Sequence, residues 1–239
     1  MIYRFDLHIH SCLSPCGDLM NSPAAIAAAA KAAGLNGIMI ADHNTARNCP
    51  ALAEACARQG IACLFGMEIT TAEEVHVLAA FDTLEQAQRM TDRVYTALPK
   101  RVNQPEIFGD QPVVTVDEEI VEMEWRLLSA PTRLALPEVE QHVHGLGGLF
   151  VACHVDRATF SVFSQLGALS GEERFDAVEL TRYSAKEAWV PKLCGLPILR
   201  ASDAHYLENI GDIWNEADLP TFSVACLRQA LREGRVTNP

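Results

Sequence analysis

The chain has 239 residues, 49% of them hydrophobic, which is enough for one large domain with a sizeable core. It carries 31 acidic against 19 basic residues and has no long run of Lys or Arg, which argues against long double-stranded nucleic acid as a partner. We find no secretory signal and no apolar run long enough to span a membrane, and the eight cysteines show no disulfide framework, so we expect a cytoplasmic protein without a membrane partner.

The first part of the chain alternates apolar runs with helical patterns. The apolar runs that predict strands are residues 2–9, 37–41, 61–65 and 75–81. The expected helices are residues 24–33, 50–59 and 83–98. This rhythm breaks at about residues 101–133, where two β-rich runs flank an acidic turn and predict an inserted β-hairpin or small subdomain.

The alternation returns after the insert. Helices are expected at residues 136–144, 162–169 and 224–233, and strands at 148–153, 177–180 and 197–201. Repeated strand-then-helix units with continuous apolar strands predict a parallel sheet in an α/β fold. About seven such units favour a barrel over an open sheet. We therefore expect residues 1–239 to form a single domain with a small insert.

Most histidines of the chain lie within or at the ends of predicted strands. These are His8, His10, His43, His76, His154 and His205. Residues two apart on a strand share a face, and the carboxyl ends of parallel strands meet at one mouth, so these side chains can converge. His142 and His144 face different directions of a predicted helix and are left out of the site.

Any one of these histidines could equally be a core or capping residue. Carboxylates also follow the apolar runs, as at Asp42, Glu68 and Asp203, and buried carboxylates are costly unless they are paired or metal-bound. A purely structural explanation would need several independent coincidences, so the pattern predicts one shared metal site.

The ordered motifs resemble those of the polymerase and histidinol phosphatase (PHP) superfamily of metal-dependent phosphoesterases. The matching segments are Asp6 to His10, Asp42-His43, Gly66 to Glu68 and Ser202 to His205. The resemblance runs nearly end to end and implies a distorted (β/α)7 TIM-like barrel with a trinuclear site.

The resemblance also implies how nine ligands divide among the ions. One ion would be held by His8, His10, Glu68 and Asp203, a second would share Glu68 with His76 and His154, and a third would bind Asp18, His43 and His205. The loop of residues 14–18 leaves open whether Asp18 or Cys16 lies near the third ion.

Imidazole and carboxylate ligands suit two to three divalent ions of Zn, Mn or Fe. A hydroxide bridging two ions is the expected nucleophile on a phosphate ester. Asp6 and Asp42 are expected to orient ligating imidazoles, although hydrogen bonding at the strand ends is an equal alternative. Arg157 and Arg182, with Arg47 as a weaker candidate, are expected to bind the substrate phosphate unless they form surface ion pairs.

Several substrates and two rival functions stay open at this stage. The substrate could be a phosphorylated small molecule, a nucleotide or a short oligonucleotide, and the acidic composition favours small molecules or short strands. A metal-dependent amidohydrolase shares the His-x-His of the first strand but fits Glu68, His76 and Asp203 less well. A non-catalytic, metal-stabilised binding module is the other alternative.

Overall fold

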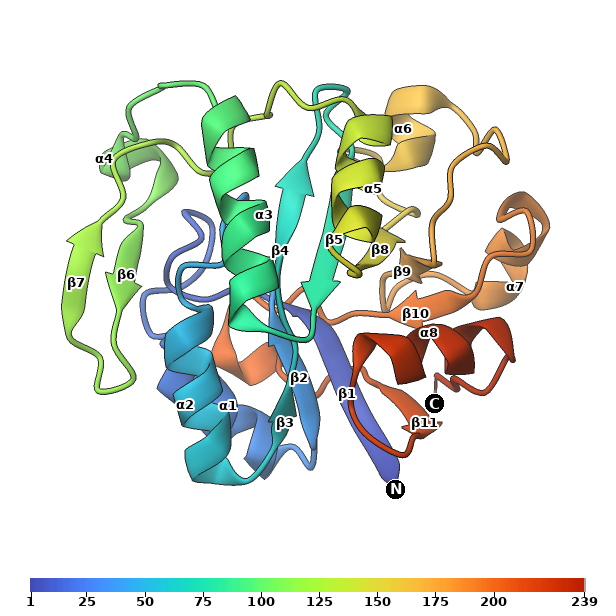
Figure 1. Ribbon diagram of the computed structural model, residues 1–239, viewed down its shortest axis with the longest axis horizontal. Helices are drawn as coiled ribbons and strands as arrows, with labels where there is room; N and C mark the ends of the chain where they lie inside the picture. Colours follow the sequence, from blue (N-terminus) through green and yellow to red (C-terminus); the bar gives the residue numbers. More distant parts are fainter. Residues whose placement is uncertain (239) are drawn as a thin grey trace.

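The computed structural model describes residues 1–238, which form a mixed α/β fold (Figure 1). Its strands are β1 (Ile2–Ile9), β2 (Gly37–Ile40), β3 (Ala62–Cys63), β4 (Phe65–Thr70), β5 (His76–Phe81), β6 (Pro112–Val114), β7 (Ile120–Met123), β8 (Leu149–Ala152), β9 (Ala177–Leu180), β10 (Ile198–Arg200) and β11 (Asn215–Asp218). Its α-helices are α1 (Pro23–Ala32), α2 (Cys49–Gln59), α3 (Leu84–Ala97), α4 (Pro105–Phe108), α5 (Leu136–Gly145), α6 (Val162–Leu166), α7 (Lys186–Trp189) and α8 (Val224–Arg232). The predicted α/β class is therefore confirmed.

Strand pairing gives two larger sheets and one hairpin. The strand orders are β11-β1-β2-β3 in the first sheet and β10-β9-β8-β5-β4 in the second, with β6-β7 separate. Strands β1, β2 and β3 are parallel to one another, as are β8, β9 and β10. However, β5 runs antiparallel to both of its neighbours, and β11 runs antiparallel to β1. The parallel sheet expected from the sequence is thus wrong for β5, and β11 is an additional strand that was not expected.

The regular pairing of strands does not close a barrel within residues 1–238. Single bridges connect the two sheets instead, one between Ile9 and Ala204 and one between His43 and Glu68. Both bridges lie at the carboxyl ends of β1 and β2. The two sheets therefore approach each other at the end of the molecule where the strand histidines lie.

Helix α3 illustrates how the sequence fixes the layer that covers the second sheet. Its N-cap is Thr83, whose hydroxyl accepts from the Gln86 backbone N–H at 3.2 Å, while the Gln86 side chain accepts from the Thr83 N–H at 3.0 Å. The buried face of α3 carries Met90 and Val94, which share one apolar cluster with residues of β4, β5 and β8. Burying each large apolar side chain contributes about 1.5–3 kcal/mol, so this packing holds the strands that carry the site.

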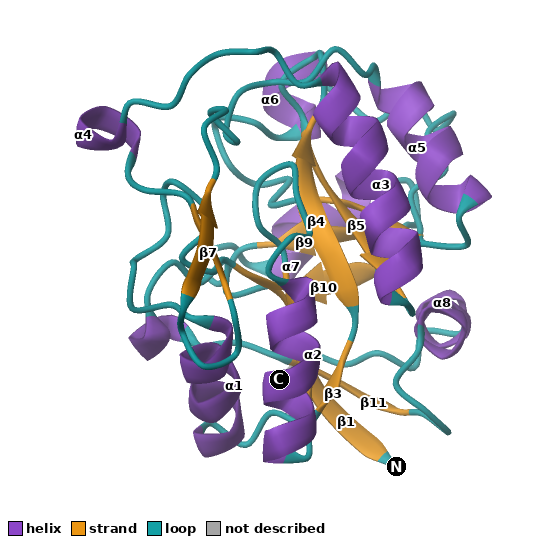
Figure 2. Cartoon of the chain, turned by 60° about the vertical axis from the view of Figure 1, so that its left-hand side comes forward, coloured by secondary structure: helices purple, strands orange, loops and turns teal. Residues whose placement is uncertain are grey.

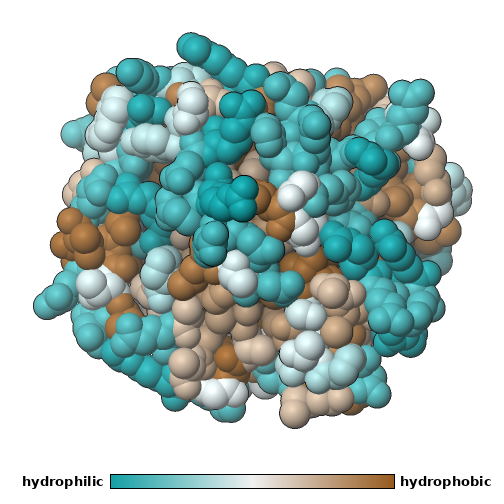
Figure 3. Space-filling view, in the orientation of Figure 1, coloured by the Kyte–Doolittle hydropathy of each residue, from teal (hydrophilic) through white to brown (hydrophobic). Residues whose placement is uncertain are grey.

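The predicted insert contains the antiparallel β6-β7 hairpin and α4. The hairpin lies to one side of the two larger sheets, above α1, and α4 lies apart from it at the upper left (Figure 2). Ion pairs hold the hairpin there: Arg58 lies 2.8 Å from Asp117, and Arg47 contacts Glu122 and Glu124. Arg47, a weaker phosphate candidate, is therefore committed to the hairpin. The outer strand β7 is exposed, and its apolar side chains form the hydrophobic patch at the left of Figure 3.

Two strands differ from the expectations in ways that bear on the site. The single strand expected at 61–65 is replaced by β3 and a separate β4, so Glu68 lies inside a strand and not after its end. Strand β11 has the polar sequence Asn-Glu-Ala-Asp, which carries no strand pattern, and forms by pairing with β1. No helix described over residues 1–238 has the length and apolar character to cross a membrane.

Candidate metal centre

The six strand histidines, far apart in the sequence, lie together at one end of the sheets. Their ring centroids are separated by 5.1 Å (His8 to His10), 4.8 Å (His10 to His43), 4.4 Å (His10 to His205), 5.3 Å (His43 to His76), 5.4 Å (His76 to His154) and 6.0 Å (His8 to His154). All are buried except His205, whose side chain is 26% exposed. The rings thus form a continuous cluster.

The direction of β5 explains how His76 reaches this cluster. His76 is the first residue of β5, whereas His10, His43, His154 and His205 follow the carboxyl ends of their strands. Because β5 runs antiparallel to β4 and β8, its first residue lies at the edge where its neighbour β8 ends. The antiparallel strand therefore contributes its amino end to the same mouth.

The carboxylate of Glu68 lies at the centre of the cluster and is 1% exposed. Its Oε1 is 2.7 Å from Nδ1 of His76 and 3.0 Å from Nε2 of His154. Its Oε2 is 3.1 Å from Nδ1 of His43 and 3.5 Å from Nε2 of His10. Burial raises the pKa of Glu68, but the surrounding imidazoles outweigh burial and hold this pKa well below its usual range. Glu68 is therefore an ionised group that can bridge cations.

Asp203 provides a second carboxylate at the same place. Its Oδ1 is 3.1 Å from Nε2 of His10 and 3.5 Å from Nε2 of His8. Burial raises the pKa of Asp203, and His8 and His10 more than offset this, so the carboxyl stays ionised. Asp203 and His154 also have positive φ angles of 49° and 28°, conformations that cost about 1–3 kcal/mol each and cluster at functional sites.

Hydrogen bonds fix which imidazole nitrogens face the cluster. Nδ1 of His8 lies 2.9 Å from Glu179, and Nδ1 of His205 lies 2.7 Å from the carbonyl oxygen of Asp203. Carboxylate and carbonyl oxygens only accept, so each Nδ1 carries the proton. The Nε2 atoms of both rings are then the nitrogens that would bind a cation, as in ligating histidines.

His10 is oriented through a hydroxyl group. Its Nδ1 lies 2.9 Å from Oγ of Ser14, which donates to Asp42 at 2.8 Å and so accepts from the imidazole. Burial lowers the pKa of His10 to about 4, which keeps the ring neutral near pH 7. Asp42 therefore contacts no imidazole directly and acts through Ser14.

The carboxylate of Asp6 accepts hydrogen bonds from a backbone N–H and a hydroxyl group. It accepts from the backbone N–H of His8 at 3.1 Å and from the hydroxyl of Ser202. Burial raises the pKa of Asp6 to about 7, although the Ser202 hydrogen bond opposes the rise. Asp6 thus links β1 to the segment after β10, which is the strand-end alternative given by the sequence.

The unpaired atoms and the donor types fit a cluster of divalent cations. Within residues 1–238, the buried atoms Nε2 of His8, Nδ1 of His43 and Nδ1 of His154 have no hydrogen-bond partner. Each such atom costs about 1–3 kcal/mol, a cost that a bound cation removes where the atom is a ligand. Groups whose ligand atoms lie within 4.8 Å of one another are His8-His10-Glu68, His43-Glu68-His76 and His10-Cys16-His205.

These groups combine the candidate ligands differently from the three sets that the resemblance implies, which stay a prediction. His43 lies with Glu68 and His76, while His205 lies with His10 and Cys16. The carboxylate of Asp18 accepts from the backbone N–H of Met20 at 2.8 Å, within its own loop.

Sequence reasoning missed Glu179 and Cys153 as site residues. Both are buried, and with His8 they form a further group of ligand atoms within 4.8 Å. The available signal was a lone glutamate inside the apolar run 177–180, which is costly unless a partner awaits it. His142 and His144 lie on α5, where they contact Arg93 and Asp176.

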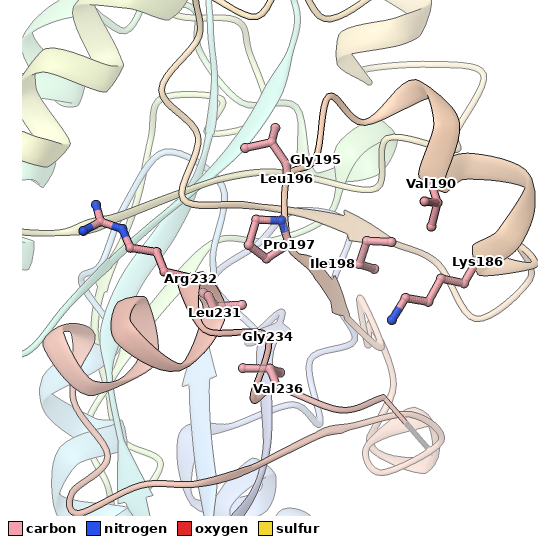
Figure 4. Close-up of a pocket in the computed structure, with 10 residues that line it drawn as sticks. All are labelled: Lys186, Val190, Gly195, Leu196, Pro197, Ile198, Leu231, Arg232, Gly234 and Val236. Carbon is pink, nitrogen blue, oxygen red and sulfur yellow. The ribbon is translucent and has the colours of Figure 1, made fainter.

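Both candidate phosphate-binding arginines line a pocket of about 250 Å³ beside the cluster. Arg157 is 45% exposed at its side chain and pairs with Asp203, whereas Arg182 pairs with Asp212. Tyr183 and Tyr206, which are 81% and 51% exposed, line the same pocket. A different pocket, between α8 and the segment before β10, contains none of the clustered histidines (Figure 4).

Sequence comparisons identify two regions of the chain. The sequence model of the PHP domain matches residues 6–160, and that of the PHP-associated region matches residues 192–236. The first match covers every candidate ligand up to His154. A comparison with curated protein sequences finds no match.

Comparisons with solved structures agree on the fold. The lesion-specific endonuclease PfuEndoQ from Pyrococcus furiosus is 19% identical with a TM-score of 0.71, over 100% of this chain and 58% of its own. A complex of Endonuclease Q with a 27-mer duplex containing an abasic lesion is 20% identical with a TM-score of 0.72, and the match covers 98% of this chain and 57% of that one. A Bifidobacterium adolescentis protein described as a metal-dependent phosphoesterase is 22% identical with a TM-score of 0.56, and the match covers 84% of this chain and 87% of that one.

These similarities limit two conclusions. The chain spans 58% of the length of the first endonuclease, so it corresponds to only part of that protein. The second endonuclease was solved with duplex DNA, so the exclusion of long duplex nucleic acid, drawn from the acidic composition, is not supported.

Proposed function

Because the chain belongs to the PHP family of metal-dependent phosphoesterases and is thus a hydrolase, we propose that it cleaves the phosphate ester of a nucleotide or short oligonucleotide. One observation carries the proposal: five imidazoles have a nitrogen within 3.5 Å of the Glu68 carboxylate. Such an array of imidazole nitrogens and carboxylate oxygens suits Zn, Mn or Fe. Another phosphorylated small molecule is the alternative substrate within the same chemistry.

The residues proposed to hold two to three ions are those that the geometry groups. The set is His8, His10, Glu68, Asp203, His76, His154, His43 and His205, with Asp18 or Cys16 as the ninth. When bound, divalent ions lower the pKa of water towards ~7 and neutralise charge on phosphoryl oxygens. Glu179 and the Ser14-Asp42 pair keep the Nε2 atoms of His8 and His10 aimed inward.

Arg157 and Arg182 are proposed to bind the substrate phosphate. Both have exposed guanidinium groups at the pocket beside His205, and a guanidinium fork matches two phosphate oxygens. Arg157 pairs with Asp203, and Arg182 pairs with Asp212. These carboxylates hold the arginines in place until a phosphate competes for them.

The proposal also covers the architecture. We treat residues 1–239 as one domain in which the single bridges Ile9–Ala204 and His43–Glu68 join the two sheets into a distorted TIM-like barrel. The segment 101–133 is then an insert at the rim, held by Arg47 and Arg58.

Exposed aromatic side chains favour a substrate that carries nucleobases. Phe160 is 41% exposed and stacks on His76 with ring centroids 4.6 Å apart, and Tyr206 follows His205 directly. Aromatic rings of this kind stack on any base and contribute about 1–3 kcal/mol per base. One exposed aromatic ring therefore lies against His76, and another lines the pocket beside His205.

Replacing Tyr206 with Leu is expected to lower kcat/KM for a short single-stranded oligonucleotide about tenfold, because a stacking surface is lost. Tyr206→Phe, which keeps the ring, is the matched control and should stay close to wild type. A base-free sugar phosphate should be affected far less than the oligonucleotide. Equal losses on both substrates would count against base stacking.

The experiment that tests the proposed function combines metal analysis with a phosphatase assay. Purified protein should contain about two or three divalent ions per chain, and chelation should reduce release of phosphate from an aryl phosphate more than tenfold. Adding Zn, Mn or Fe should restore the activity. Protein that binds no metal and stays inactive after metal addition would overturn the proposal.

Assays of the same metal-loaded protein on amides and lactones distinguish the rival amidohydrolase activity from the proposed phosphoesterase activity. A metal-loaded protein that turns over amides or lactones but releases no phosphate from any ester would replace our proposal. The non-catalytic binding module is set aside because the chain belongs to a family of hydrolases.

A further inference from the structure

The loop after β1 is tightly folded against the candidate metal cluster. The N–H of Ser14 donates to the carbonyl of Ser11 at 3.1 Å, and that of Gly17 donates to the carbonyl of Ser14 at 2.8 Å. A Cβ atom on Gly17 would lie 2.5 Å from the Ser11 carbonyl oxygen, so the turn admits only glycine. The N–H of Asp18 donates to the carbonyl of His205 at 3.0 Å. This bond ties the loop to the segment that carries His205.

The two candidate ligands of this loop are placed differently. The Asp18 carboxylate accepts from the Met20 N–H at 2.8 Å and so closes a local turn. The Cys16 sulfur instead lies within 4.8 Å of ligand nitrogens of His10 and His205. Of the two side chains, the thiol is the one grouped with the imidazoles.

The surroundings of Cys16 also point to a cation. His10 is buried, and its ring lies 4.4 Å from that of His205 and 4.8 Å from that of His43. The buried Nδ1 of His43 has no hydrogen-bond partner within residues 1–238. Cys16 thus lies beside a cluster of three imidazoles, one of which has a buried nitrogen without a hydrogen-bond partner.

We infer that Cys16, and not Asp18, is the ligand from this loop, binding an ion together with His205 beside His10. This inference rests on the proposed metal-dependent function and deepens it. Thiolate ligands favour Zn²⁺, whereas carboxylate and imidazole positions also accept Mn²⁺ or Fe²⁺. The Cys16 position therefore selects Zn²⁺ over Mn²⁺, while the positions around Glu68 do not require this choice.

Cobalt substitution tests the inference without relying on activity. Metal-free protein is loaded with Co²⁺ alone, since thiolate-bound Co²⁺ has a near-ultraviolet charge-transfer band that nitrogen and oxygen ligands do not give. Wild type is expected to show the band, and Cys16→Ser is expected to lose it together with about one Co²⁺ per chain. Asp18→Asn should retain both.

Cys153→Ser is the control for the other thiol near the cluster, since Cys153 lies with His8 and Glu179. The inference predicts that this variant keeps the band. Circular dichroism of each variant checks that it folds. In competition between Zn²⁺ and Mn²⁺, Cys16→Ser should lower the preference for Zn²⁺ at this position by about tenfold or more.

The outcomes separate this inference from the proposed function. Bound Co²⁺ without a thiolate band in wild type, or a band that disappears in Cys153→Ser but persists in Cys16→Ser, overturns the role of Cys16 and leaves the metal-dependent function intact. Loss of one ion in Asp18→Asn also overturns it. If the protein binds no Co²⁺ at all, both the role of Cys16 and the proposed metal-dependent function are overturned.

Discussion

Glu68→Gln is expected to lower kcat/KM for phosphate-ester hydrolysis on the order of 10³-fold and to remove at least one metal ion per chain. Gln has nearly the same shape as Glu but no charge, so it would not neutralise cations held beside His76, His154 and His43, whose ring nitrogens lie within 3.1 Å of the Glu68 carboxylate. Bound cations contribute several kcal/mol of charge stabilisation in the transition state, and each 1.4 kcal/mol is a factor of ten. Steady-state kinetics and elemental analysis of the same sample measure both effects.

Glu74→Gln is the matched control because it makes the same chemical change at an exposed residue just before β5. It should leave kcat/KM and metal content within a factor of about two. If Glu68→Gln retained its metal and lost less than tenfold in kcat/KM, Glu68 would not be the central ligand. The metal-dependent mechanism would then have to be built on Asp203.

The sequence was sufficient to predict which histidines meet. His8 lies in β1 and His10 directly follows it, so these two side chains, two apart in the sequence, share a face; His43 and His154 lie three and two residues after β2 and β8. These signals are local, because alternation along a strand and its end can be read from neighbouring residues. Their convergence then follows from the general geometry of α/β sheets.

The parts that could not be predicted depend on contacts between distant segments. Whether a strand runs parallel or antiparallel is decided by its partners, so the short runs of β4 and β5 gave no sign of their antiparallel pairing. The loop of Cys16 is joined to the His205 segment by a hydrogen bond between Asp18 and His205, which lie far apart in the chain. In the same way, Glu179 becomes a site residue only because β9 brings it to His8.

Asp176 gives the largest expected effect on stability. Its carboxylate accepts from the Phe150 N–H at 3.0 Å and from Nε of Arg228 at 2.8 Å, and it lies 3.3 Å from Nε2 of His144. These contacts join β8, α8 and α5 through one side chain that is 7% exposed. Burial raises the pKa of Asp176, but the hydrogen bonds from His144 and Arg228 outweigh it and lower this pKa from 3.8 to about 2.

The sign of the pH dependence follows from that shift. Because the pKa is lower in the folded state, folding favours the ionised carboxyl, and its stabilising contribution is complete above the unfolded pKa of 3.8. The contribution is lost as the pH falls from 3.8 through about 2. A shift of this size corresponds to about 2 to 3 kcal/mol.

Asp176→Ala is therefore expected to lower the free energy of unfolding by about 2 to 3 kcal/mol near pH 7, because Arg228 also loses its partner. The difference from wild type should shrink as the pH approaches 2, which urea titrations at several pH values can measure. Asp117→Ala, at an exposed carboxylate paired with Arg58, is the control and should change stability much less. A deficit that is absent near pH 7, or that grows as the pH falls, would show that Asp176 is not stabilised as its ionised form.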